Sequence, residues 1–241
     1  MIAKLSLFTA ILALAFLAIF GCSGVFSGSG DDMPCITCLD SYYGPYTDKG
    51  NSIASYRTVT IGSQKWMAEN LDYNVSGSKC YSNNNANCVK YGRLYDWATA
   101  MALPSSCNSA DCSGQVSVKH QGICPSGWHI PSDAEWSTLI NYVESDKGCS
   151  SCAGKHLKSV SGWNSYSGIV NLDSYGFSAL PGGYGISGGI FRDAGGSGYW
   201  WSASEYNSNY AYDRDPDYYD EGAYWYYNDK GGLFSVRCLQ D

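Results

Sequence analysis

The residues best suited to inorganic chemistry lie in an acidic stretch near the C-terminal end, Asp213-Arg-Asp-Pro-Asp-Tyr-Tyr-Asp-Glu-Gly222. Asp213, Asp215 and Asp217 occupy alternating positions, and two further carboxylates follow them. Hard oxygen ligands at this spacing can surround Ca²⁺, so the three aspartates are a candidate calcium site. The stretch has neither the glycine at position six nor the glutamate at position twelve of an EF-hand loop. A solvated acidic loop without metal therefore stays open as the alternative.

Aromatic side chains are the second chemical resource of this chain, which has 21 Tyr and 8 Trp but only 15% charged residues. A dense aromatic run lies between Tyr199 and Tyr227. Exposed rings combine a flat apolar face with a polar edge, which suits stacking on sugars or anchoring a protein partner. The candidate ligand-binding residues are Trp201, Tyr218, Tyr219, Tyr224, Trp225 and Tyr227. The alternative is that these rings build the core of a domain poor in Leu and Ile.

Other tryptophans are expected to be buried. Adjacent residues of a strand point to opposite faces, so Trp200 is assigned to the core and Trp201 to the surface. The same core assignment applies to Trp66, Trp97, Trp128 and Trp136.

Nucleophilic and acid–base catalysis find little support. The only histidines are His120, His129 and His156, and neither a Gly-x-Ser-x-Gly nor a His-Glu-x-x-His motif occurs. His129 stands in an alternating segment between Trp128 and Ile130, where a structural hydrogen-bonding role is expected. A pair of carboxylates for glycoside hydrolysis is defined by its separation in space, which a sequence does not show. We therefore expect no enzyme, no catalytic residue and no required cofactor.

The cysteines indicate export. There are 11, and setting Cys22 aside leaves ten, a number typical of a disulfide framework in an exported chain. Local spacing pairs eight of them as Cys35–Cys38, Cys80–Cys88, Cys107–Cys112 and Cys149–Cys152. Elimination leaves Cys124 for Cys238, and that bridge would close a loop long enough to contribute roughly 4–5 kcal/mol. Cys35-Ile-Thr-Cys38 also fits a thioredoxin-type redox motif, but no strand–helix unit surrounds it, which favours a local disulfide.

The N-terminal residues indicate a membrane anchor. Residues 1–21 combine Lys4 with an apolar run too short for a typical spanning helix, as in a signal peptide. Ile19-Phe20-Gly21-Cys22 resembles a bacterial lipobox, so Cys22 is the expected lipidation site. Lipid on Cys22 would hold the protein at the cell envelope, at the outer membrane or cell surface, without spanning. An ordinary signal peptide and an uncleaved anchor helix are the alternatives.

Charge limits the partners. The formal net charge of -7 and pI near 4.8 argue against nucleic acid, whose binding needs a basic footprint. A surface that gains its solubility from Tyr, Asn, Ser and Gly suits uncharged polar partners. We expect a polysaccharide or an envelope protein.

These residues require elements that position them. Residues 22–55 are rich in Gly, Ser and Asp and are expected to form a flexible tether, followed by one domain over 56–241. Residues 57–61 and 64–71 predict a hairpin. Helical spacing predicts a helix over 91–103, and a Ser132/Glu135 capping box predicts another over 133–144.

The second half changes character. Short β-like runs separated by glycine-rich turns are expected over 175–184, 198–205 and 233–239, and a short amphipathic piece over 157–160. Helices early and many short strands late predict an α+β domain.

Several ordered motifs resemble one family. Residues 61–73, 91–101, 124–136, 175–184, 199–205 and 234–238 are similar to the Fibrobacter succinogenes major paralogous domain, over about 56–241. The resemblance implies an exported or surface protein, often a lipoprotein. The closing motif is also similar to formylglycine-generating domains, which implies a C-type-lectin-like single domain with short twisted antiparallel strands, two main helices and disulfide-stapled loops.

Two departures from the family pattern stand out. Leu233 replaces the usual glycine before the closing motif, and residues 211–232 are more acidic than usual. No cysteine motif here maps onto the reactive pair of the formylglycine-generating enzymes. We therefore expect a non-catalytic, surface-anchored binding module, for adhesion to glycan or another envelope component. The alternatives are an envelope assembly protein with protein partners only and an enzyme of the formylglycine-generating type.

Overall fold

The computed structural model describes residues 48–186 and 188–241. The predictions for residues 1–21, for Cys22 and for the Cys35–Cys38 pair lie outside these residues, as does most of the predicted tether. Its last residues are described and lie against the domain, where the Lys49 amide donates to the carbonyl of Asp72 at 3.0 Å. No helix in the described ranges is long and apolar enough to cross a membrane.

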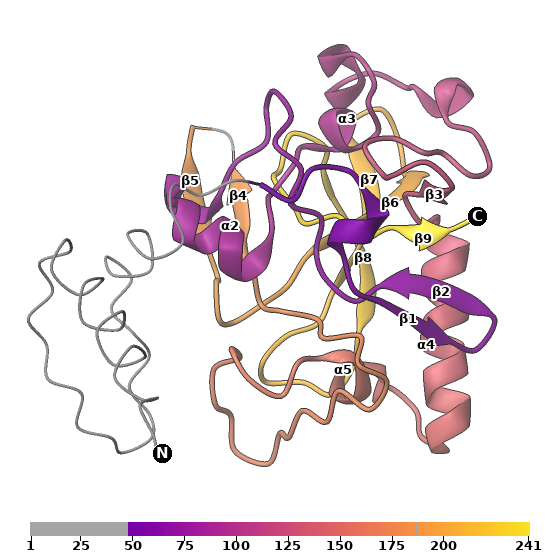
Figure 1. Ribbon diagram of the computed structural model, residues 1–241, viewed down its shortest axis with the longest axis vertical. Coiled ribbons are helices and arrows are strands. Elements are labelled where there is room, and N and C mark those ends of the chain that lie inside the picture. The colour runs from indigo at the N-terminus through magenta and orange to yellow at the C-terminus, as the bar shows by residue number, and fades with distance from the viewer. Residues whose placement is uncertain (1–47, 187) are drawn as a thin grey trace, which may run out of the picture. The chain divides into compact units, whose positions relative to one another are not determined.

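The first sheet is assembled from both ends of the domain (Figure 1). The predicted hairpin is confirmed as β1 (Thr58–Ile61) and β2 (Gln64–Met67). Strand β9 (Leu239–Gln240) pairs antiparallel with β2 on one side and with β3 (Trp128–His129) on the other. The C-terminal strand therefore lies in the middle of the order β1-β2-β9-β3.

The disulfide Cys124–Cys238 fixes this arrangement. The predicted pairing is confirmed, and it joins residues 114 positions apart at the point where β9 meets β3. A cross-link over so long a loop removes much conformational entropy from the unfolded chain. It therefore secures a strand that has only two residues and would gain little from its own ladder.

Helix α4 (Asp133–Lys147) confirms the predicted capping box. The Ser132 amide donates to Glu135 Oε2 at 2.8 Å, and the Glu135 amide donates to Ser132 Oγ at 3.3 Å. The helix ends at Gly148, whose φ of 63° suits a residue without Cβ. Its buried face belongs to a core cluster with Trp66 and Trp200 and contributes Trp136, Leu139 and Val143.

The helix predicted over 91–103 is wrong in its first half. Tyr91 ends helix α2 (Asn85–Tyr91), and Gly92 then turns the chain with φ 76°. Residues 93–95 are extended, because Leu94 bridges to Lys79 and Tyr95 bridges to the closing motif. Only α3 (Trp97–Ala100) follows, capped by Asp96. The apolar spacing that suggested one helix arises from two elements facing one core.

The remaining elements are short. Helix α5 (Ala153–Leu157) precedes a two-stranded sheet of β4 (Tyr184–Ile186) and β5 (Ile190–Arg192). The three-stranded sheet is β6 (Trp200–Glu205), β7 (Tyr210–Asp215) and β8 (Tyr224–Asp229), all antiparallel. Short 3-10 helices cover Ile53–Ser55, Tyr81–Asn83, Ser105–Asn108 and Ser113–Gln115.

This composition confirms an α+β domain. Of the two predicted main helices, α4 is present as a long helix, whereas the other is reduced to α3. The lectin-like fold stays a prediction.

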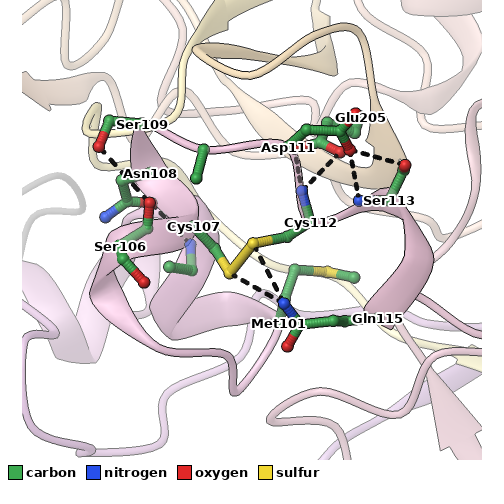
Figure 2. Close-up of a disulfide and its surroundings, with 12 residues drawn as sticks. Met101, Ser106, Cys107, Asn108, Ser109, Asp111, Cys112, Ser113, Gln115 and Glu205 are labelled. Atoms are coloured by element: carbon green, nitrogen blue, oxygen red, sulfur yellow. Dashed lines mark hydrogen bonds between the residues drawn. A yellow bond between two sulfur atoms is a disulfide. The ribbon is translucent and has the colours of Figure 1, made fainter.

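The three local disulfides are confirmed as well, at Cys80–Cys88, Cys107–Cys112 and Cys149–Cys152. Figure 2 shows how the second of them is tied to the sheet: the Cys112 amide donates to both carboxylate oxygens of Glu205 at 3.2 Å. Glu205 ends β6 and also forms a buried ion pair with Lys230. The cross-linked loop is thereby fixed to one end of the three-stranded sheet.

A buried arginine links the closing motif to two loops of the domain. Arg237 is fully buried, and its Nη2 donates to Asn70 Oδ1 at 2.7 Å and to the Ser178 carbonyl at 3.2 Å. Its guanidinium lies 4.3 Å from the centre of the Phe177 ring. Burial lowers the pKa of Arg237 to about 9. Arg237 of the closing motif therefore stabilises the core and does not belong to a surface site.

Candidate functional site

Strands β7 and β8 carry a row of aromatic rings on one face. Their register places Tyr212 opposite Tyr227 and Arg214 opposite Trp225, and paired residues of antiparallel strands share a face. The ring of Tyr206, from the β6–β7 connection, stacks on Tyr227 at a centroid distance of 4.1 Å and an angle of 8°. We call this surface the aromatic strip; it consists of Tyr206, Tyr210, Tyr212, Trp225 and Tyr227.

The strip is exposed where helix α4 stops covering the sheet. Arg214 lies under the start of α4 and donates from Nη1 to Asp133 Oδ1 at 2.7 Å. Beyond that point the face is open, and 58% of Trp225 and 45% of Tyr206 are solvent-accessible. Ring-to-ring contacts hold the side chains in place without a covering element. The strip is therefore a preformed apolar surface with tyrosine hydroxyls at its margin.

Trp201 was predicted to belong to this surface, and that prediction is wrong. It is fully buried, stacks on Phe234 at 4.3 Å and donates from Nε1 to the Tyr95 carbonyl at 2.8 Å. Alternation does hold, since Trp200 and Trp201 belong to two different core clusters. Both faces of β6 are covered, so neither tryptophan is free.

A polar hollow of about 540 Å³ forms next to the far end of β7. Of the six candidate ligand-binding residues, it contains Tyr218 and Tyr219, and of the three candidate metal ligands it contains Asp217. Trp201 and Tyr224, of the candidate ligand-binding residues, and Asp213 and Asp215, of the candidate metal ligands, belong to neither the strip nor the hollow. The lining of the hollow comprises Asn164, Asp193, Ala194, Gly196, Ser197, Tyr199, Asp217, Tyr218 and Tyr219.

Asp217 is the best-anchored residue of the hollow. Ser197 pairs with it as an antiparallel bridge and donates its hydroxyl to Asp217 Oδ1. Behind the loop, the buried Lys158 donates from Nζ to the carbonyls of Asp217 and Asp220 at 2.7 and 2.6 Å. Burial lowers the pKa of Lys158 to about 8. The loop is therefore fixed from the inside while its carboxylate faces the hollow.

Three tyrosines complete the wall. The rings of Tyr218 and Tyr219 meet edge to face at 5.2 Å, and Tyr199 meets Tyr184 in the same way at 5.0 Å. A hydrogen bond to Asp217 and the charge of that carboxylate raise the pKa of Tyr219 to about 12. Burial, together with nearby carboxylates, raises the pKa of Tyr199 well above its ordinary value. Both hydroxyls therefore stay protonated; that of Tyr219 donates to Asp217, and its oxygen can still accept a hydrogen bond.

The three aspartates predicted to bind calcium do not gather. Asp213 is fully buried on the face of β7 opposite Tyr212, and its Oδ2 has no hydrogen-bond partner among the described residues. Burial and the charge of Asp215 raise the pKa of Asp213 to about 8. Burial and the charge of Asp217 raise that of Asp215 to about 7. A preformed three-carboxylate cage is therefore absent from the described part, and calcium binding stays a prediction.

One group of potential metal ligands does converge. Among the described residues, the group of three whose ligand atoms lie within 4.8 Å of one another is Cys149, Cys152 and His156. The two sulfurs are bridged, so they are not available as thiolates in this state. Burial and the charges of Lys147 and Lys155 lower the pKa of His156, which keeps its imidazole neutral at pH 7.

His129 has structural partners. Its Nδ1 lies 2.8 Å from Asp241 Oδ1 and its Nε2 lies 3.0 Å from Glu135 Oε1. Burial opposes protonation of the ring, but the hydrogen bonds to Glu135 and Asp241 outweigh it and raise the pKa of His129. The buried histidine therefore ties β3 to the start of α4 and to the C-terminal residue.

Sequence reasoning missed part of each surface. Tyr206, Tyr210 and Tyr212 lie in the aromatic run but are not among the predicted ligand-binding residues, although Tyr210-Ala-Tyr212 has the alternation of a strand that presents tyrosines on one face. Asn164 and Asp193 carried no local signal. Tertiary contacts bring them to the hollow; for example, the backbone amide of Asn164 donates to the Gly195 carbonyl at 2.7 Å.

Comparison with known families gives one match. The model described as Fibrobacter succinogenes major domain matches residues 59–240. It covers both the aromatic strip and the polar hollow. No curated protein and no solved structure matches the chain.

Proposed function

Because this chain belongs to the Fibrobacter succinogenes major domain family, we propose that it is a non-catalytic binding module, anchored at the cell envelope through Cys22, that takes polysaccharide as its ligand. The placement at the outer membrane or cell surface is part of the proposal. The observation that carries it is the aromatic strip, since a soluble domain rarely leaves contiguous large rings open without a partner.

The chemistry of the strip favours a neutral carbohydrate. Its five side chains are uncharged, and the nearest cation on that face, Arg214, is paired with Asp133. Stacked rings present flat apolar area at the scale of a pyranose face, and tyrosine hydroxyls at the edge can bond sugar hydroxyls. Because Tyr206, Tyr227 and Trp225 are already ordered by their neighbours, little side-chain entropy is lost on binding.

Retention on insoluble polysaccharides and a glycan array test this proposal. We expect the purified chain to bind at least one neutral polysaccharide, and Trp225→Ala and Tyr227→Ala to weaken retention about tenfold or more. Tyr142→Ala, which removes another exposed ring on α4, is the matched control and should bind like the parent protein. Absence of retention on every neutral glycan, or equal loss in the control, would contradict the proposal.

One observation favours a protein partner as the second candidate function. Strand β8 is the outer strand of its sheet, and in the described residues its far edge has no ladder partner. Such an edge can accept a strand from another protein. Crosslinking on intact cells would support an assembly role if it captured a protein neighbour at β8, and finding none would count against it.

The enzyme alternative of the formylglycine-generating type needs a reactive thiol. All eight cysteines of the described residues are in disulfide bonds. Labelling of the native, unreduced protein with a thiol reagent would favour this alternative only if a cysteine reacted.

A further inference from the structure

The polar hollow has the composition of a site for an organic cation. We propose that it binds a protonated amine carried on a hydroxylated ligand, namely an amino sugar unit of a glycan. This inference rests on the proposed glycan-binding function and assigns a second subsite to it, separate from the aromatic strip.

The charge of the hollow is the first argument. Asp193 and Asp217 line it, and no lining residue among those described is basic. The ammonium of Lys158 is held by the backbone carbonyls of Asp217 and Asp220, and Lys158 is not part of the lining. Two carboxylates and no basic side chain therefore line the hollow, which favours a positively charged ligand.

The carboxylates of Asp217 and Asp193 differ in their hydrogen bonds. Asp217 accepts hydrogen bonds from Ser197 and Tyr219, which orient its carboxylate. The carboxylate of Asp193 has no hydrogen bond or ion pair within the described residues, while its backbone carbonyl receives the amides of Gly196 and Ser197 at 2.9 Å. The turn is thus held by its main chain, and the Asp193 side chain is left for a ligand.

Aromatic faces extend the same preference. Tyr199, Tyr218 and Tyr219 line the hollow together with the two aspartates, and an ammonium placed against tyrosine rings gains a cation–π attraction. Lys158 shows this chemistry on the inner side of the wall, where its Nζ lies 5.1 Å from the centre of the Trp163 ring. An ammonium bound in the hollow would therefore contact aromatic rings, as Lys158 does in the interior.

Two features select a hydroxylated amine over a metal ion or a bare amine. The carboxylates do not belong to any group of three ligand residues within 4.8 Å, so the convergence that a divalent metal needs is missing from the described part. The side-chain amide of Asn164 and the hydroxyls of the three tyrosines supply hydrogen-bonding groups for sugar hydroxyls. The volume of about 540 Å³ lies in the range of small-ligand sites.

The test compares three β-1,4-linked hexamers on the full chain by calorimetry: glucosamine, N-acetylglucosamine and glucose. They share a backbone and differ in the substituent at C2, which carries a positive charge only in protonated glucosamine, so tighter binding of the glucosamine hexamer than of both others reports the ammonium. We expect the glucosamine hexamer to bind at least tenfold more tightly than the other two. Equal affinity for all three would overturn the inference while leaving glycan binding intact.

Variants locate the site. Asp193→Asn and Asp217→Asn should each remove most of the preference for glucosamine, since asparagine keeps the shape and the Ser197 bond but loses the charge. Asp229→Asn removes one charge at the other end of β8 and should leave the preference unchanged. Loss of the preference in Asp229→Asn, or its persistence in Asp193→Asn and Asp217→Asn together, would place the amine elsewhere.

Two further arms separate the possible causes of failure. Trp225→Ala should weaken retention on neutral polysaccharide but keep the glucosamine preference, so the two surfaces fail independently. A lysine-containing peptide tests the other source of ammonium groups. If the peptide binds at the hollow and the glucosamine hexamer does not, the amino sugar assignment is overturned in favour of a basic protein segment.

Discussion

The aromatic strip and the polar hollow use tyrosine in two different ways. In the strip, Tyr212 and Tyr227 project from paired strands, so strand geometry sets their spacing and neighbouring rings are their main contacts. In the hollow, Tyr218 and Tyr219 lie on a turn, and Asp217 bonds the hydroxyl of Tyr219. The first arrangement presents ring faces and the second presents hydroxyls and carboxylates. Residue type alone therefore does not indicate which ligand a tyrosine serves.

The largest expected effect tests whether both regions depend on one core. Replacing Cys124 and Cys238 together with serine removes the long-range disulfide and should lower the free energy of unfolding by about 4–5 kcal/mol. The thermal unfolding transition reported by ring fluorescence of the strip and that reported by a probe at the hollow should then coincide at a lower temperature. Two separate transitions would show that the regions are independent units.

The next effect concerns Asp213, which lies on the face of β7 opposite the strip. Its pKa is raised to about 8 from 3.8, so folding holds a proton that the unfolded chain releases, and stability falls as pH rises between these values. Asp213→Asn should therefore stabilise the protein by several kcal/mol at pH 8 and by almost nothing near pH 4.

Chemical denaturation of the parent and of Asp213→Asn at both pH values measures this difference. Strip ligands should bind the variant as they bind the parent, because the change is on the other face. A stabilisation that is the same at pH 4 and pH 8 would contradict the assigned titration.

A smaller effect separates the two regions directly. Lys158→Met keeps the length of the side chain but leaves the carbonyls of Asp217 and Asp220 without their donor, at a cost of about 2 kcal/mol. The loop of the hollow should loosen, so binding of the glucosamine hexamer weakens while retention on neutral polysaccharide persists. Equal loss of both ligands would mean that Lys158 supports the whole fold and not one surface.

The smallest effect lies within the strip. Tyr206→Leu removes the ring that stacks on Tyr227, a contact of about 1 kcal/mol, and should weaken polysaccharide binding several-fold. Tyr206→Phe keeps the ring and should bind nearly as the parent does. If phenylalanine is as damaging as leucine, the hydroxyl and not the stacking is the important group.

Features with a local or arithmetic origin were predictable. The capping box at Ser132 depends on residues three positions apart, and the β1–β2 hairpin depends on alternation across one turn. The Cys124–Cys238 pair followed from elimination once the nearby cysteines were paired. The helix over 91–103 failed because the apolar spacing there is shared by two short elements that Gly92 separates.

By itself, the sequence determined the residues that could bind a ligand: the tyrosines, the acidic turn and the disulfides that hold them. Tertiary structure decided which of these are accessible and which meet. Trp201 and Trp225 have similar local settings on strands, but β6 is covered on both faces and β8 is an outer strand. Asp193 and Asp217 share a hollow because Ser197 connects them: its amide donates to the Asp193 carbonyl, and the residue forms a bridge with Asp217. Burial and convergence depend on contacts between distant segments, which no local pattern encodes.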